Sequence, residues 1–132
     1  MLRKVNLVCV GTLKKSYFKN LCEKLSYNIN LIEVKESDCV RESFDILNIL
    51  KKVPNAYSVL FDLDGFDSKN VLHKIRSSYF SNKSVYFIIG GSNGVAPILK
   101  DYCDVLLKLS DLTYNHQIFR ICSMIFINES LK

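Results

Sequence analysis

Hydrophobic side chains follow two patterns that alternate along this chain. Near-continuous apolar runs are typical of strands buried on both faces, and they predict strands at residues 4–11, 29–34, 57–65, 84–91 and 104–109. Between these runs, apolar residues recur every three or four positions, which predicts helices at 16–25, 42–53, 68–80, 96–103 and 117–132. The sequence therefore predicts strands and helices in strict alternation.

This alternation predicts the fold class. Strands this apolar, each followed by a helix, favour an α/β domain with a mostly parallel sheet and helices on both faces. The length of 132 residues fits a single domain spanning 1–132. Ligands of such sheets bind beyond the carboxyl ends of the strands, so a site is expected in the loops after the third, fourth and fifth strands.

The last helix carries more apolar surface than a terminal helix needs. From Ile118 to Ile127 it is apolar nearly all round, and Arg120 and Ser123 are the exceptions. A helix lying on a small sheet needs only one apolar stripe. The surplus predicts a homodimer through the C-terminal helix, and a helix sunk deeply into its own core is the alternative.

Glycines gather after the fourth strand, where Gly90, Gly91 and Gly94 are three of the five in the chain. Glycine is used where the backbone takes a positive φ or where another group approaches it closely. The segment has neither the G-x-G-x-x-G spacing of dinucleotide sites nor the G-K-[ST] ending of a P-loop. Two interpretations stay open: a structural turn, and a site whose backbone groups meet a flat, neutral base.

A polar cluster separates the fifth strand from the last helix. Arg120 lies about one turn into that helix, after the cluster of Ser110, Asp111, Thr113, Asn115, His116 and Gln117. A histidine at the start of a helix is as often an ordinary backbone-bonded residue as a functional one. Beside Thr113 and Arg120, at the carboxyl edge of a parallel sheet, His116 favours a binding role.

Composition and charge limit the partners and the cell compartment that the protein can have. The net charge of +5 fits an anionic partner such as RNA, and it equally fits an ordinary basic surface. Five cysteines without a C-x-x-C pair indicate small buried side chains in a reducing compartment, with neither a disulfide framework nor a metal site. The first apolar run is short and lacks a cleavage site, and no run approaches the roughly 20 apolar residues of a membrane span. We expect a cytoplasmic protein with no membrane partner.

Four segments carry a resemblance to a known family. They are V-N-L-V-C-V-G-T-L-K, F-D-L-D-G, F-I-I-G-G-S-N-G and L-S-D-L-T-Y-N-H-Q-I-F-R. In this order and at similar separations they resemble the RlmH family, SPOUT-class methyltransferases that act on N3 of a pseudouridine in 23S ribosomal RNA of the assembled ribosome. The resemblance covers essentially the whole chain. It implies a SPOUT-type fold with a C-terminal trefoil knot, and a homodimer formed through that region.

The resemblance also implies a cofactor, S-adenosylmethionine, held in the knot by three loops. Glycine would let the backbone lie flush against it. Carried over position by position, the cofactor contacts fall on Phe61, Gly90, Gly91, Gly94, Leu109, Ser110, Asp111, Leu112, Thr113 and Tyr114. We expect His116 and Arg120 to border the substrate pocket, with Arg120 pairing with a phosphate or with the developing charge.

The chain departs from the family pattern at three places. Asn115 stands where the family has proline, Glu129 stands where it has arginine, and the family's C-terminal tail with tyrosine and histidine does not follow Lys132. A non-catalytic dimer that binds ribosomal RNA or a nucleotide is therefore the alternative function. A flavodoxin-like or response-regulator-like domain has the same alternation, but here no phosphate loop or acidic cluster follows the first strand.

Overall fold

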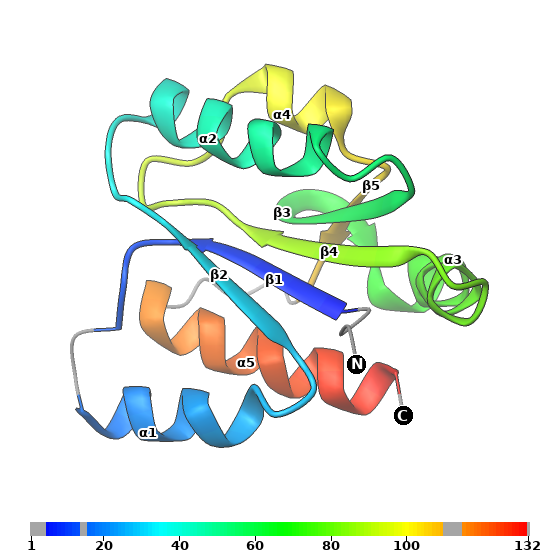
Figure 1. Ribbon diagram of the computed structural model, residues 1–132, viewed down its shortest axis with the longest axis horizontal. Helices are drawn as coiled ribbons and strands as arrows, with labels where there is room; N and C mark the ends of the chain where they lie inside the picture. Colours follow the sequence, from blue (N-terminus) through cyan, green and yellow to red (C-terminus); the bar gives the residue numbers. More distant parts are fainter. Residues whose placement is uncertain (1–4, 14–15, 110–114, 132) are drawn as a thin grey trace.

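A five-stranded parallel sheet forms the centre of the molecule (Figure 1). The computed structural model describes residues 5–13, 16–109 and 115–131, apart from the side chains at positions 64, 67, 68, 70 and 116. The strand order is β2-β1-β4-β3-β5, and every neighbouring pair is parallel. The strands are β1 (Val5–Val10), β2 (Asn30–Val34), β3 (Ala56–Asp67), β4 (Ser84–Ile89) and β5 (Val105–Lys108).

Helices cover both faces of this sheet. They are α1 (Ser16–Leu25), α2 (Cys39–Lys51), α3 (Ser68–Phe80), α4 (Pro97–Tyr102) and α5 (His116–Ser130). In Figure 1, α2 and α4 lie together above the sheet, while α1 and α5 lie side by side below it. The chain thus folds into three layers with the sheet in the middle.

Two hydrophobic cores result, because successive side chains of a strand point to opposite faces. On β1, Leu7 and Cys9 pack with residues of α1, α3 and α5, whereas Val8 and Val10 pack with residues of α2 and α4. All six residues of β1 are buried, as expected for a strand covered on both faces. The apolar runs of the sequence are therefore explained by this sandwich of helices.

The predicted order of ten elements is confirmed, while the bounds of most elements differ by one to three residues, and two of these differences have a clear cause. Strand β3 extends to Asp67 because it resumes pairing with β5 after a bulge: Leu107 is opposite both Phe61 and Phe66. Helix α2 begins at Cys39, earlier than predicted, because the Asp38 carboxylate caps it by accepting a hydrogen bond from the Arg41 N–H at 2.8 Å.

Helix α5 buries apolar residues on one side and exposes others on another side. Ile121, Met124 and Ile127 lie in the core, while Ile118 and Ile125 are 41% and 47% exposed. Positions 118 and 125 are two turns apart, so they lie on the same side of the helix. The surplus apolar surface predicted from the sequence is therefore present as a stripe along α5.

The trefoil knot stays a prediction. It depends on the path of the chain between β5 and α5, and residues 110–114 lie outside the described residues. Within the part of the chain that the structure describes, no helix is both long and apolar enough to cross a membrane.

Candidate functional site

The strands that precede the predicted site segments end at one edge of the sheet. Since all five strands are parallel, the ends of β3, β4 and β5 point the same way, and β3 lies between the other two. Neighbouring strands are about 4.8 Å apart. Gly90, just after β4, and Leu109, just after β5, are therefore separated by about 10 Å across β3. The glycine segment and the end of β5 therefore flank one small region of surface.

Phe61 lies buried at the centre of this edge. Its ring stacks on Phe87 of β4 at a centroid distance of 5.9 Å and meets the edge of Phe119 of α5 at 5.6 Å. The side chain is only 8% exposed, so it joins the sheet to α5. A ligand at this edge would meet the Phe61 backbone more readily than its ring.

The glycines form a tight turn. The Gly94 N–H donates to the Gly91 carbonyl at 3.0 Å, and Gly94 has a φ of +80°, which favours glycine. A Cβ built on Gly90 would lie 2.6 Å from Cγ1 of Val95, and one on Gly91 would collide with the carboxylate of Glu42. Each of these glycines thus has a reason within the protein itself, either close packing or a positive φ, and a role of the same turn in binding stays a prediction.

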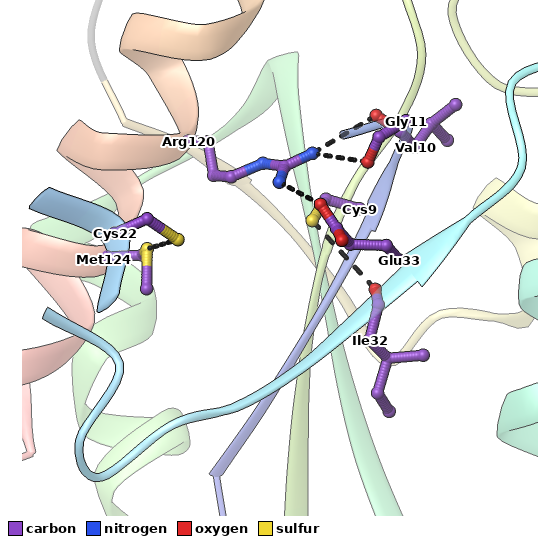
Figure 2. A network of polar contacts seen from close by, with 8 residues as sticks. All are labelled: Cys9, Val10, Gly11, Cys22, Ile32, Glu33, Arg120 and Met124. Atoms are coloured by element: carbon purple, nitrogen blue, oxygen red, sulfur yellow. Dashed lines mark hydrogen bonds and ion pairs between the residues drawn. The ribbon is translucent and has the colours of Figure 1, made fainter. Parts of the chain in front are cut away.

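Arg120 is engaged inside the protein (Figure 2). Its Nη1 pairs with Oε2 of Glu33 at 2.6 Å, and its Nη2 donates to the carbonyls of Gly11 at 2.9 Å and Val10 at 3.4 Å. The residue is 1% exposed. These contacts tie α5 to the carboxyl ends of β1 and β2. They differ from the phosphate contact expected from the sequence, which would require Glu33 to be displaced.

The Cys9 thiol lies beside this ion pair, and the sulfur atoms of Cys22 and Met124 lie farther along the same core (Figure 2). Burial raises the pKa of the Cys9 thiol from 9.0 to about 12, although the Arg120 cation acts in the opposite direction. Cys22 lies nearby with its Sγ 3.6 Å from Sδ of Met124 (Figure 2). Both cysteines are buried and free, as the sequence indicated. They act as neutral packing groups.

Asn115 explains how α5 begins without the proline that the family uses. Its side-chain Oδ1 accepts a hydrogen bond from the Gln117 N–H at 2.9 Å, which satisfies one of the free donors of the first turn. His116 is the first residue of the helix. The expected contacts Ser110, Asp111, Leu112, Thr113 and Tyr114 lie outside the described residues, and Leu109 packs half-buried against the core.

Asp62 has a structural partner at the same edge. Its carboxylate is 3.1 Å from Nζ of Lys100, which ties β3 to α4. This pairing gives no support to a phosphoacceptor role. Among the described residues, no three His, Cys, Asp or Glu side chains converge as a metal site would require.

Sequence reasoning missed three residues of this edge: Glu33, Glu42 and Ser43. Glu33 alternates with apolar residues in a strand, and the other two lie on an amphipathic helix, so each resembled a solvent-facing position. One signal was available, since Glu42 and Ser43 interrupt the apolar spacing of α2 near its start. Polar residues near the start of a helix are commonly capping residues, so the sequence offered no reason to expect that these two side chains are buried.

Comparisons with known proteins agree with this architecture. Residues 3–125 match the family model described as "Predicted SPOUT methyltransferase". The chain is 33% identical to "Ribosomal RNA large subunit methyltransferase H" of Fusobacterium nucleatum, over 89% of this chain and 86% of that protein. It is 37% identical to the protein of the same name from Metamycoplasma arthritidis, over 89% of this chain and 85% of that one.

A solved structure shows a similar fold. The SpoU methyltransferase AviRb from Streptomyces viridochromogenes, solved in complex with AdoMet, aligns with a TM-score of 0.52 at 9% identity. The alignment covers 100% of this chain, which spans 61% of the AviRb chain. The fold, the match to the family model and the identity to curated relatives all agree. The chain belongs to the SPOUT methyltransferase family, among the relatives named ribosomal RNA large subunit methyltransferase H.

Proposed function

We propose that this protein transfers a methyl group from S-adenosylmethionine to N3 of a pseudouridine in 23S ribosomal RNA of the large ribosomal subunit. Membership in the SPOUT family supports the methyl transfer, and the names of its curated relatives support the RNA substrate. One structural observation carries the proposal: the ends of β3, β4 and β5 lie at one edge of a parallel sheet. Such an edge is where α/β sheets bind ligands.

The donor would be held mainly by backbone groups of three loops. The proposed contacts are Phe61, Gly90, Gly91, Gly94, Leu109, Ser110, Asp111, Leu112, Thr113 and Tyr114. A flat adenine suits such a site, because apolar neighbours cover its faces and main-chain amides meet its ring nitrogens. Protein atoms already lie against the positions that a Cβ of Gly90 or Gly91 would take. The backbone conformation of this segment is therefore set before a ligand binds.

S-adenosylmethionine supplies a methyl group on a positively charged sulfur. The protein's own task is to hold N3 of the base in line with the breaking bond, and orientation of this kind lowers a barrier by about 7 kcal/mol or more in favourable cases. N3 must also lose its proton. A nearby base would accept this proton, or a nearby cation would stabilise the anion that its loss leaves on the base. We propose that His116 borders the substrate and that Arg120 acts as a positioning residue, because its guanidinium is already paired with Glu33.

The assembly proposed for the active protein is a cytoplasmic homodimer of single SPOUT domains, each spanning residues 1–132 and knotted in its C-terminal part. The apolar stripe of Ile118 and Ile125 on α5 supports this arrangement. In such a dimer both subunits would contact the ribosome together. The net charge of +5 favours an anionic partner.

Two measurements test this function. Titration calorimetry should show heat on addition of S-adenosylmethionine, whereas a module that binds only RNA should show none. Ribosomes from a strain lacking the protein should then accept one methyl group per particle from the purified enzyme, located by mass spectrometry of the 23S RNA. His116→Ala and Arg120→Ala should each slow this transfer. Wild-type rates in both variants would refute the assigned roles.

A further inference from the structure

The glycine turn is held from behind by two consecutive residues of α2. Glu42 packs its carboxylate against Gly91 at the start of the turn, and the Ser43 Oγ accepts a hydrogen bond from the Ala96 N–H at 2.8 Å beyond its end. Both polar side chains are buried, at 2% and 0% exposure. Between the two held points, residues 92–94 are exposed. The segment is therefore fixed at both ends and open in the middle.

Glu42 has an unusual environment for a carboxylate. Its Oε2 accepts a hydrogen bond from the Ser37 N–H at 2.8 Å, which fixes the loop that precedes α2. Its Oε1 is buried and has no hydrogen-bond partner in the described structure. A buried acceptor left unpaired costs about 1–3 kcal/mol, and more when it is charged. Packing alone would favour an apolar residue here, so this carboxylate calls for a functional explanation.

The contact with Gly91 supplies that explanation. The Glu42 carboxylate occupies the place that a side chain at position 91 would take, since a Cβ there would lie 3.1 Å from Cδ and closer still to Oε1. The carboxylate therefore packs directly beside the Gly91 backbone. Gly91 directly follows Gly90, at the end of β4, where the loops of the proposed donor site begin.

We propose that Glu42 is a positioning residue for the methyl donor, acting through Gly91, and that Ser43 fixes the far end of the same turn. This inference rests on the proposed function, because it concerns the binding of S-adenosylmethionine. The carboxylate holds the Gly91 peptide in the place where its backbone groups meet the donor. It touches neither the donor nor the RNA, so its loss changes donor binding and leaves ribosome binding intact.

Crossed double variants test the contact. Gly91→Ala forces a Cβ into the Glu42 carboxylate and so displaces the turn. A displacement of about 1 Å in a segment that positions a substrate can lower the rate of methyl transfer by up to about 100-fold. Adding Glu42→Ala makes room, so the double variant should bind S-adenosylmethionine more tightly than Gly91→Ala alone. Gly90→Ala is the matched control, because its Cβ would meet Val95 instead. It should be rescued by Val95→Ala and not by Glu42→Ala.

The readouts separate positioning from folding. In Glu42→Ala, which empties the space beside Gly91, the Kd and KM for S-adenosylmethionine should rise about tenfold while the KM for ribosomes changes little. Glu42→Gln, which keeps the volume of the side chain, should keep both donor constants and the melting temperature near the wild-type values. The inference is overturned if wild type binds the donor and Glu42→Ala binds it equally well, or if Glu42→Ala rescues Gly90→Ala and Gly91→Ala alike. A wild-type protein that shows no heat with S-adenosylmethionine overturns the proposed function itself.

Discussion

The ion pair between Arg120 and Glu33 offers the clearest test of what holds α5 in place. The Arg120 side chain is 1% exposed and that of Glu33 is 35% exposed. Breaking a fully buried pair costs about 3–5 kcal/mol, whereas an exposed pair is worth about 0–1 kcal/mol. With one partner buried and the other partly hydrated, this pair falls between those limits. We expect Glu33→Gln to lower the free energy of unfolding by about 2 kcal/mol.

The assay is urea denaturation of a double-variant cycle. Glu33→Gln leaves a buried cation facing a neutral acceptor, and Arg120→Met replaces that cation with a shorter apolar chain. If the charges stabilise each other, the double variant should lose less than the sum of the single losses, by about 1–3 kcal/mol. The slope of free energy against urea should stay constant, since the surface exposed on unfolding is unchanged.

Salt and a matched control refine the test. The interaction should persist in 1 M salt, because mobile ions screen an interior pair poorly. Glu23→Gln, at an exposed position of α1, should change stability by less than about 0.5 kcal/mol. A coupling energy below about 0.5 kcal/mol, or one abolished by salt, would show that the pair does not anchor α5.

Three further predictions concern other parts of the molecule. Because burial raises the pKa of Cys9 from 9.0 to about 12, the native thiol stays protonated where the unfolded one ionises. The contribution of Cys9 to stability should thus be constant below about pH 9 and fall above it by up to about 1.4 kcal/mol per pH unit, so that urea titrations above pH 9 should show a less steep loss in Cys9→Ala than in wild type. Ile125→Asp should convert a dimer to a monomer in light scattering, while Ile98→Asp, at an equally exposed position of α4, should not; equal masses for both would contradict the α5 interface. Gly65→Ala would place a Cβ 2.7 Å from the backbone carbon of Leu106 and should lower the unfolding free energy by about 1–3 kcal/mol; an unchanged urea midpoint would contradict the close packing of the bulge.

Buried polar groups divide the candidate site into a part that sequence could predict and a part that it could not. The turn after β4 and the beginning of α5 near residue 116 could be predicted as local structure, because glycine clusters and polar loops between apolar elements are local signals, while their part in a site stays a prediction. Arg120 was identified as important, but its partner was not. Glu33 lies 87 positions earlier in the chain, and no local pattern reports a pairing over that distance.

The sequence by itself determined the order of strands and helices, since burial on one or both faces imposes a period that local residues reveal. It also determined the fold class, because apolar strands that alternate with helices favour a covered parallel sheet. Only the tertiary structure decided that β1 lies beside β4 and that β3 lies between β4 and β5. It also decided that Glu42 fills the space beside Gly91. Strand neighbours and buried polar contacts depend on how distant segments pack against each other, and a local period carries no information about that packing.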